Sequence, residues 1–230
     1  MRIGVVGAAG RVGSQIVAAI LSSPGLELAA CLVNPRSPHV GRPVSGGSIE
    51  YRPADAAMNA HCDVMIDFST PAATVALQAQ CAKKRIPFVI GTTGFSVAQV
   101  RKLTSHARYR PLLLSDNFAT GAHLATITAA MIAQALPGAL ASEAQSYTLR
   151  PDTGALEALP LGGNDRRPGD LTQYHFDVGG VEITLTHRVN TLSAYADGAL
   201  AAAHWLVGSN PAPGLYSPAD MFRQQPRPGS

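Results

Sequence analysis

Three glycines near the N-terminus have the spacing of a phosphate-binding turn. Gly7, Gly10 and Gly13 form a GxxGxxG pattern between the apolar run Arg2–Val6 and a predicted helix. In such a turn the first glycine permits a tight bend, the second lets the backbone approach a pyrophosphate, and the third lets the helix pack closely on the strand. The helix N-terminus then presents N–H groups to the phosphates. The pattern predicts a Rossmann-type dinucleotide-binding unit in residues 1–115.

The residues after the second predicted strand bear on which dinucleotide binds. Sites that prefer NAD usually carry an acidic residue about 20 positions after the glycines, whereas Val33 and Asn34 stand there in this chain. Arg11 and Arg36 could instead face a 2′-phosphate through their planar guanidinium groups. The alternative for Arg36 is a solvated loop side chain. We therefore expect NADPH, with NADH as the alternative.

Strand-like and helix-like segments alternate through the first half of the chain. Strands are predicted at residues 2–6, 26–33, 64–68, 87–90 and 111–114, and helices at residues 13–21, 71–84 and 96–107. Alternation of this kind is typical of a parallel sheet with helices on both faces. The positions after these strands are therefore where a ligand is expected.

The pattern changes after Asn117. Helices are predicted at residues 124–136 and 193–207, half-buried antiparallel strands at 143–149 and 177–188, a loop at 152–170, and an irregular tail at 208–230. We expect an α/β protein with a Rossmann-type doubly wound parallel sheet, formed by residues 1–118 and 194–230. Residues 119–193 are expected to form a smaller α+β substrate and oligomerisation domain with a mostly antiparallel sheet.

Composition and charge exclude several classes of protein. The 230 residues carry a net charge of only +3, and their basic residues are scattered, which argues against nucleic-acid binding. Cys31, Cys62 and Cys81 are odd in number, lack CxxC spacing and lie in apolar segments, which predicts reduced, buried thiols. No apolar run reaches the ~18 residues of a membrane span, and the first residues enter a strand at once. We expect a cytoplasmic protein with no metal site, because no His, Cys or Asp cluster has ligand spacing.

Several segments together resemble the dihydrodipicolinate reductase family of lysine biosynthesis. Residues 6–13 are similar to its glycine turn, residues 66–71 (IDFSTP) to its IDF segment, and residues 117–121 (NFATG) to its NFSxG segment. Residues 89–95 match the family's VIGTTGF segment completely. The resemblance covers most of residues 1–206, and the GTTGF segment is its most specific part.

The resemblance implies where the cofactor would lie. In the family the GTTGF segment lines the nicotinamide end of the cofactor, and the NFS segment lies at the cleft between the domains. Together with the glycine turn, this gives a predicted cofactor-binding set of Gly7, Ala9, Gly10, Arg11, Val12, Asn34, Arg36, Phe68, Ser69, Gly91, Thr92, Thr93, Asn117 and Phe118.

The family's substrate-binding motif is replaced in this chain. The family pattern ExHHxxKxDxPSGT corresponds to residues 143–155, where Gln145 and Ser146 stand in place of the two histidines and Leu149 in place of the lysine. Leu192 stands where the family has an arginine. An amide cannot donate a proton at neutral pH as histidine can, and leucine cannot pair with a carboxylate. We therefore expect the dicarboxylate substrate of the family to be a poor one here.

Four other residues are candidates for the lost roles. Arg150 could hold a carboxylate, and Tyr147, His175 and His187 could supply a proton. Each histidine has an alternative reading as a sheet residue bonded to backbone.

These observations lead to one expected function and two alternatives. We expect an NAD(P)H-dependent reductase of a C=N or conjugated C=C bond in a small amino-acid-derived substrate, in specialised biosynthesis. The alternatives are a non-catalytic cofactor-binding homologue, acting as regulator or partner subunit, and retention of the lysine-pathway reductase activity. The resemblance also implies a homo-oligomer, either a tetramer or a dimer.

Overall fold

The computed structural model describes residues 1–45, 47–59, 61–81, 84–136, 140–149, 156–159, 168–178 and 180–222. Its first sheet contains the strands β1 (Arg2–Val6), β2 (Glu27–Val33), β3 (Tyr51–Pro53), β4 (Val64–Asp67), β5 (Phe88–Ile90), β6 (Pro111–Leu114) and β11 (Gly214–Tyr216). Their order is β11-β6-β5-β4-β1-β2-β3, and every neighbouring pair runs parallel. The predicted Rossmann-type parallel sheet is therefore confirmed.

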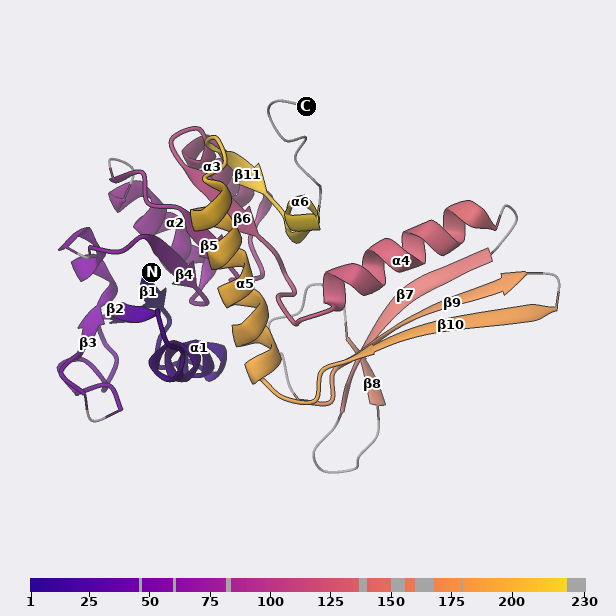
Figure 1. Cartoon of the computed structure of the whole chain (residues 1–230), viewed down its shortest axis with the longest axis horizontal. Coiled ribbons are helices and arrows are strands. Elements are labelled where there is room, and N and C mark those ends of the chain that lie inside the picture. The colour runs from indigo at the N-terminus through magenta and orange to yellow at the C-terminus, as the bar shows by residue number, and fades with distance from the viewer. Residues whose placement is uncertain are drawn as a thin grey trace.

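Helices cover both faces of this sheet (Figure 1). Helices α1 (Arg11–Ser22) and α5 (Ser193–Ser209) pack on one face with Ile3 and Val5 of β1. Helices α2 (Pro71–Gln80) and α3 (Val97–Ala107) pack on the other face with Val6. Successive side chains of a strand point to opposite faces, so one apolar strand supplies both layers of the core.

The order of strands reverses direction between β1 and β4. The chain moves outward from β1 to β2 and β3, and then crosses back to β4 on the other side of β1. The carboxyl ends of β1 and β4 consequently lie side by side with their following loops diverging. Open parallel sheets bind ligands in the crevice at such a point.

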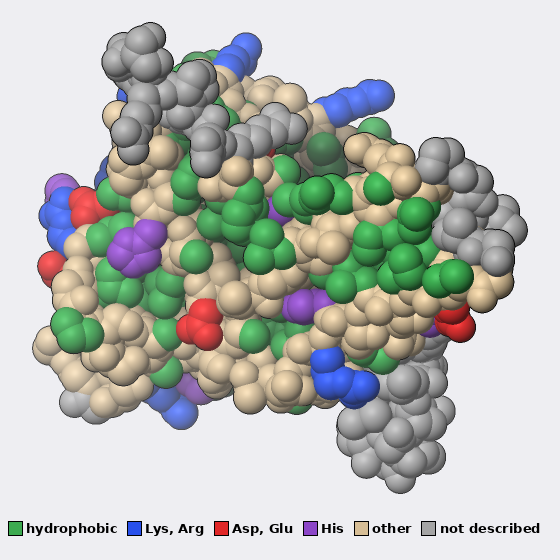
Figure 2. Space-filling view, turned by 45° about the vertical axis from the view of Figure 1, so that its right-hand side comes forward, with side chains coloured by type: hydrophobic (Ala, Val, Ile, Leu, Met, Phe, Trp, Pro, Cys, Tyr) green, Lys and Arg blue, Asp and Glu red, His purple; other side chains and the backbone are tan. Residues whose placement is uncertain are grey.

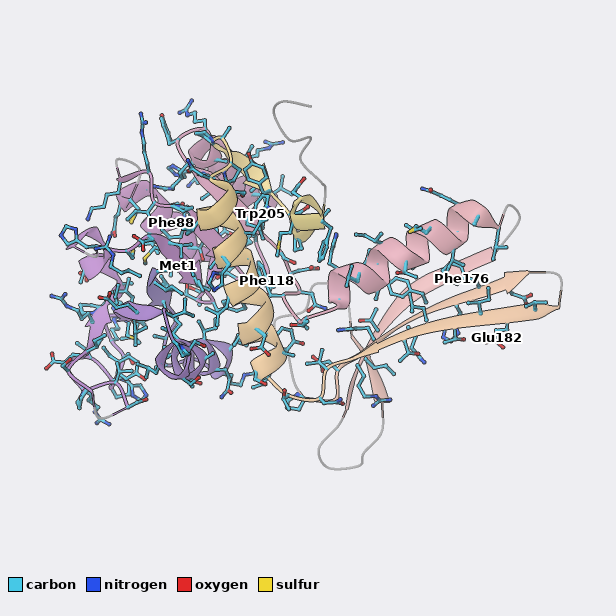
Figure 3. All side chains as sticks on the ribbon, in the orientation of Figure 1. Met1, Phe88, Phe118, Phe176, Glu182 and Trp205 are labelled. Carbon is cyan, nitrogen blue, oxygen red and sulfur yellow. The ribbon has the colours of Figure 1, made fainter. Side chains whose placement is uncertain are left out.

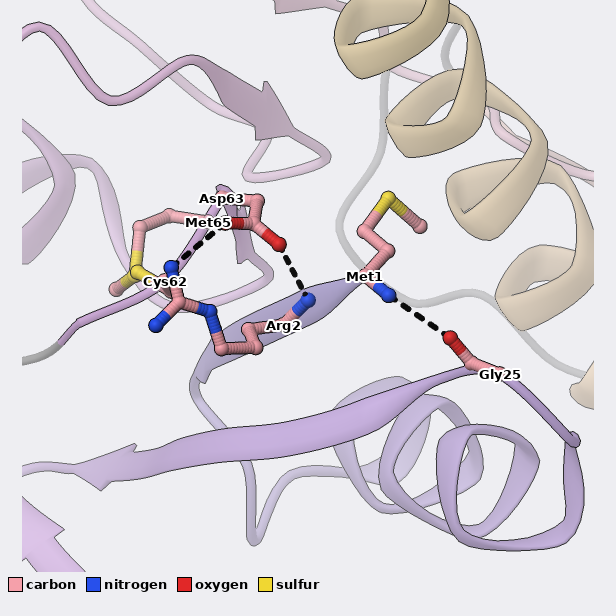
Figure 4. Close-up of polar contacts among 6 residues, drawn as sticks. All are labelled: Met1, Arg2, Gly25, Cys62, Asp63 and Met65. Carbon is pink, nitrogen blue, oxygen red and sulfur yellow. Dashed lines mark hydrogen bonds and ion pairs between the residues drawn. The ribbon is translucent and has the colours of Figure 1, made fainter.

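The amino end of β1 is fastened to segments on both sides (Figure 4). The N-terminal amine of Met1 donates to the carbonyl oxygen of Gly25 at 2.8 Å. The backbone N–H of Arg2 donates to Asp63 Oδ2 at 2.7 Å, and the Arg2 guanidinium lies 3.0 Å from Asp63 Oδ1. These hydrogen bonds lower the pKa of Asp63. The pair is exposed, so we assign it a minor role in stability.

A second, antiparallel sheet extends away from the first (Figure 1). Helix α4 (Ala122–Ala135) precedes the strands β7 (Leu140–Leu149), β8 (Leu156–Leu159), β9 (Leu171–Val178) and β10 (Val181–Arg188), which lie in the order β10-β9-β7-β8. The hydroxyl groups of Tyr174 in β9 and Thr126 in α4 lie 2.9 Å apart, which places α4 on one face of this sheet. Leu124 and Met131 of α4 remain exposed, and Figure 2 shows hydrophobic side chains gathered on this side of the molecule.

The structure corrects several predicted boundaries. The loop expected at 152–170 contains β8, which pairs with β7. The segment 177–188, expected as strand throughout, crosses a hairpin turn at Gly180 (φ +91°), and its first strand begins at Leu171. The tail expected to be irregular carries β11 and helix α6 (Pro218–Phe222). β8, β11 and α6 have four, three and five residues, which is too few to show a periodic pattern in the sequence.

Helix α2 ends at Gln80, four residues before its predicted end at residue 84. The guanidinium of the fully buried Arg110 donates to the carbonyl oxygens of Gln78 and Cys81. These carbonyls belong to the end of α2, where the helix has no intrahelical donors left. A cation at the C-terminal end also suits the helix dipole.

The three cysteines are buried and free, as expected. Burial raises the pKa of Cys31 to about 12. Among the described residues, no helix is long and apolar enough to cross a membrane, and no group of His, Cys, Asp and Glu could hold a metal ion. The domain limits at residues 118/119 and 193/194 stay predictions.

Candidate cofactor and active site

The glycine turn lies between β1 and α1 with the geometry that a diphosphate requires. Gly7 has φ +76°, and a Cβ atom there would lie 2.4 Å from the carbonyl oxygen of Phe68. A Cβ atom on Gly13 would lie 2.0 Å from the carbonyl oxygen of Gly7. Gly10 is the N-cap of α1 and supplies no capping side chain. The first N–H groups of α1 therefore face outward from a cradle that side chains would fill, which fits a phosphate ligand.

A cavity of about 400 Å³ begins at this turn and continues over the end of β2. It is lined by six of the predicted residues, namely Gly7, Ala9, Gly10, Asn34, Phe68 and Ser69. Asn34 Oδ1 accepts a hydrogen bond from the backbone N–H of Arg36 at 2.8 Å, so the loop bends there. Arg36 itself is exposed beside the cavity and does not line it. This position at the end of β2 suits the adenosine half of a dinucleotide.

A second cavity of about 200 Å³ lies over the ends of β4, β5 and β6. Its walls are Arg11, Val12, Phe68, Ser69, Gly91, Thr92, Thr93, Asp116, Phe118 and Tyr195. The rings of Phe68 and Phe118 lie 5.8 Å apart at an angle of 59°. A Cβ atom on Gly91 would lie 2.2 Å from the Phe68 ring, so only a glycine at this position leaves room for the ring. Because Phe68 and Ser69 line both cavities, the two form one extended site across β4.

A buried carboxyl group holds residues that line the cavities in place. Asp67, at the end of β4, is fully buried, and its Oδ1 accepts from the backbone N–H of Ser69 at 3.0 Å and from the Ser69 hydroxyl at 2.6 Å. The Thr92 hydroxyl lies 3.1 Å from the backbone nitrogen of Ser69 and 3.1 Å from the Thr74 hydroxyl. Burial raises the pKa of Asp67, partly offset by these hydrogen bonds. The network fixes Ser69 and Thr92, which are both cavity walls.

The loop after β6 closes the second cavity. Asn117 Oδ1 accepts from the backbone N–H of Ala119 at 3.0 Å, so Asn117 shapes the turn and is not itself a wall. Phe118 packs against helix α5, where a Cβ atom on Gly198 would lie 1.7 Å from the Phe118 carbonyl oxygen. Figure 3 shows Phe118 beside α5, between the two sheets. The aromatic wall is thus held by a helix from the far end of the chain.

Comparison with known proteins agrees with this arrangement. Residues 1–118 match the family described as dihydrodipicolinate reductase, N-terminus. The chain is 31% identical to 4-hydroxy-tetrahydrodipicolinate reductase of Parvibaculum lavamentivorans, over 96% of this chain and 97% of the relative, and 30% identical to that of Saccharophagus degradans, over 96% and 98%. The chain belongs to the dihydrodipicolinate reductase family. It is therefore an NAD(P)H-dependent oxidoreductase, and the predicted cofactor class is confirmed.

Solved structures show the same fold. Dipicolinate-bound dihydrodipicolinate reductase from Paenisporosarcina sp. is similar with a TM-score of 0.67 and 18% identity, over 97% of this chain and 99% of that chain. An engineered D-amino acid dehydrogenase bound to NADP⁺ is similar with a TM-score of 0.60 and 12% identity, over 99% and 97%. Both match nearly the whole chain, so the second sheet belongs to the shared fold.

The motif that the resemblance predicts to be replaced falls in the second sheet. The alignment with the Parvibaculum lavamentivorans relative runs over 266 positions, more than the 230 residues of this chain, so the chain is gapped against it. Strand β7 contains Gln145, Ser146 and Leu149, the residues predicted to stand in place of the family's histidines and lysine. The pairing of β7 with β9 is irregular between Ser142 and Gln145. The altered motif thus begins at a break in the strand register.

The predicted catalytic histidines do not gather at the cofactor cavities. His175 lies on the face of β9 away from α4, with Nδ1 3.2 Å from the Thr184 hydroxyl and 3.7 Å from Glu182. His187 Nε2 lies 3.1 Å from the Thr120 carbonyl oxygen. Neither histidine lines either cavity. The backbone contact of His187 matches its alternative reading as a sheet histidine.

The remaining two candidates cannot be placed at the site. Tyr147 lies in β7, opposite Leu171 of β9, but its side chain is outside the described residues. Arg150 lies outside them entirely. Their catalytic roles stay predictions.

Two wall residues were missed by sequence reasoning. Asp116 follows β6, and Tyr195 lies in the first turn of helix α5; both line the second cavity. Asp116 directly precedes the NFATG segment, which is the one sequence signal that could have drawn attention to it. Tyr195 had no local signal, because the helix that carries it reaches the cavity only in the folded chain.

Proposed function

We propose that the protein reduces a C=N or conjugated C=C bond of a small amino-acid-derived substrate, with NADPH preferred over NADH. The observation that carries the proposal is the second cavity, whose walls come from the ends of β4, β5 and β6 and which shares Phe68 and Ser69 with the cavity at the glycine turn. When bound, the reduced nicotinamide supplies hydride. The protein then has to orient the acceptor and exclude water, which Phe68 and Phe118 suit.

The replaced motif supports a changed substrate. Where the family has two histidines and a lysine, β7 carries Gln145, Ser146 and Leu149. Losing partners of a charged substrate typically costs several kcal/mol, or on the order of a thousandfold in binding or rate. We infer that this chain serves a specialised biosynthetic reaction.

A second candidate is the activity named for its relatives. The curated relatives that share about 30% identity are 4-hydroxy-tetrahydrodipicolinate reductases. Under this candidate, residues outside the altered motif would hold the dicarboxylate. A direct comparison of substrates separates the two.

The test follows oxidation of NADPH or NADH by absorbance with three substrates: the cyclic imine piperideine, cyclohexenone, and hydroxytetrahydrodipicolinate generated enzymatically. We expect turnover of piperideine or cyclohexenone and little with the dicarboxylate. Gly7→Ala, prepared identically, should abolish turnover, because its backbone cannot hold φ +76° without strain and its Cβ would meet Phe68. Turnover confined to the dicarboxylate would favour the second candidate, and none with any substrate would reject both.

Cofactor preference has its own test. Arg36 stands at the adenosine end, next to Asn34, with no carboxylate at position 33 or 34. We expect NADPH to bind at least about tenfold tighter than NADH in a fluorescence titration, since a guanidinium pairs bidentately with phosphate. Arg36→Ala should weaken NADPH and leave NADH unchanged. Equal dissociation constants in the wild type would overturn the preference.

Assembly is part of the same proposal. Leu124 and Met131 are exposed on α4, so the helix that packs on the second sheet carries apolar side chains on its outer surface. We infer a homo-oligomer, and light scattering after size exclusion measures its mass. A monomer at micromolar concentration would contradict this.

A further inference from the structure

The first cavity continues past the glycine turn toward the outer edge of the first sheet. Its described walls there include Pro35 and His39 from the loop after β2, and Ala54 from the short 3₁₀ helix η1 (Ala54–Asn59). Of the described walls of this cavity, His39 and Phe68 carry aromatic rings, and Phe68 also belongs to the second cavity. We propose that His39 is the surface on which the adenine ring of the cofactor stacks. NADPH and NADH share this ring, so the inference rests on the cofactor class and not on the proposed substrate or the preference for NADPH.

The backbone on both sides of His39 is fixed by hydrogen bonds. The N–H of His39 donates to the Ser37 hydroxyl oxygen at 3.3 Å, and its carbonyl oxygen accepts from the N–H of Arg42 at 2.9 Å. The N–H of Ser37 donates in turn to the Asn34 carbonyl oxygen at 2.8 Å, next to the end of β2. Consecutive turns therefore place His39 beside the cavity before a ligand binds.

The ring of His39 is supported by the ring of Tyr51 in β3. The two ring centroids lie 5.5 Å apart, and the rings are inclined at 55°. The backbone of Tyr51 is tied to the same loop, because its carbonyl oxygen accepts from the N–H of Gly41 at 2.9 Å and its N–H donates to the Arg42 carbonyl oxygen at 2.9 Å. β3 is the edge strand of the first sheet and pairs with β2 (Figure 1). An imidazole held in this way loses little conformational freedom when a second ring packs against it.

The other walls in this part of the cavity suit a flat, uncharged ring. Val33, Pro35, Ala54 and Ala73 contribute apolar surface beside His39. A pyrophosphate at the glycine turn places the two nucleosides of the cofactor on opposite sides of the turn, and the nicotinamide side is assigned to the second cavity. The base that remains for the end of β2 is adenine. Stacking of a base on an aromatic side chain is typically equivalent to about tenfold in affinity.

Arg36 and His39 would then recognise different groups of the cofactor. Arg36 is exposed outside the cavity walls, and the group proposed for it is the 2′-phosphate, which only NADPH carries. His39 is a wall, and the group proposed for it is a ring that both cofactors carry. Loss of Arg36 should therefore change the ratio of the two dissociation constants, whereas loss of the His39 ring should raise both by the same factor.

Two substitutions separate the ring of His39 from its polar atoms. His39→Phe keeps an aromatic face without the ring nitrogens, and His39→Gln keeps polar atoms without the ring. His204 is exposed on α5 and lines neither cavity, so His204→Gln is the control. In fluorescence titrations we expect His39→Gln to raise the dissociation constants of NADPH and NADH about tenfold each. His39→Phe and His204→Gln should leave both close to the wild-type values.

A second readout tests the contact in the wild-type protein. The ring current of a stacked adenine moves the signals of imidazole protons beneath it upfield in a proton NMR spectrum. Addition of ADP should move the His39 signal, which is assigned by its absence from the spectrum of His39→Phe. Ribose 5-phosphate, which lacks the base, should leave the signal in place.

Each other kind of contact gives a different result, and each of these results rejects the proposal. A loss confined to NADPH in His39→Gln would indicate a contact with the 2′-phosphate. A loss in His39→Phe as large as that in His39→Gln would indicate a contact through the ring nitrogens. Unchanged dissociation constants in both variants, or an imidazole signal that ADP does not move, would show that His39 does not stack on adenine. Neither readout uses turnover, so failure here leaves the proposed reductase function standing.

Discussion

Replacing Gly13 by alanine should destabilise the protein, although alanine favours a helix more than glycine does. A Cβ atom at this position would lie 2.0 Å from the Gly7 carbonyl oxygen and 2.8 Å from the Gly7 carbonyl carbon. Both are backbone atoms, so no side chain can move aside. Overpacking of this kind typically costs about 1–3 kcal/mol, against a gain of about 0.5–1 kcal/mol from alanine in a helix. We expect a net loss of about 1–2 kcal/mol in the free energy of unfolding.

The same shift should weaken cofactor binding. Relief of the overlap moves the start of α1 away from Gly7 and misplaces N–H groups aimed at the phosphates. Hydrogen bonds to charged groups contribute about 1.5–3 kcal/mol each, and about 1.4 kcal/mol is tenfold in affinity. We therefore expect the dissociation constant for NADPH to rise at least about tenfold in a fluorescence titration.

Gly208→Ala is the matched control, because Gly208 lies near the end of helix α5 and a Cβ atom there would have no neighbouring atom within 4 Å. It should gain up to about 1 kcal/mol and bind NADPH normally. Urea unfolding followed by circular dichroism measures both stabilities. If Gly13→Ala were as stable as Gly208→Ala and bound NADPH equally well, the close packing of Gly13 on the Gly7 carbonyl group would be shown to matter neither for stability nor for cofactor binding.

Three further predictions concern buried groups. Burial raises the pKa of Asp67 in the folded protein, so the free energy of unfolding falls as the pH rises above about 4, the pKa of an aspartate in the unfolded chain. Asp67→Asn should therefore be more stable than the wild type at about pH 7. Urea unfolding should show that this difference has disappeared at about pH 3. Arg110→Ala should lose about 3 kcal/mol or more, because buried carbonyls of Gln78 and Cys81 lose their donor, and an unchanged melting temperature would contradict this. Burial raises the pKa of Cys31 to about 12, so mass spectrometry should find it unalkylated by iodoacetamide at about pH 8 unless the protein is unfolded.

The parts of the fold that could be predicted from sequence are those with short, local patterns. The glycines after β1 and the GTTGF segment after β5 mark both ends of the site, because each turn needs particular residues at fixed spacing. Strands β3 and β11 have three residues each, too few to show periodicity, and they exist through pairing at the two edges of the sheet.

The acidic and phenolic walls of the second cavity show where sequence reasoning stops. Asp116 and Tyr195 are about eighty positions apart in the chain and meet only because α5 returns to pack beside β4 and β6. The family motif drew attention to β7, whereas the described walls of the cavity come from the first sheet and its flanking loops and helices. A replaced motif tells which interaction is lost, but only the folded chain tells which side chains are left facing the ligand.

The close contact of Gly198 with Phe118 has a consequence for how the second sheet is attached. The backbone N–H of Thr120 donates to the Ala194 carbonyl oxygen at 3.2 Å, so the chain leaves the first sheet and returns to it at almost the same point. The segment between Thr120 and Ala194 is an insertion whose two ends are held together. Changes within such an insertion do not alter the positions of the strands and helices of the first sheet. The motif predicted for the second sheet could therefore change while the dinucleotide site kept its geometry.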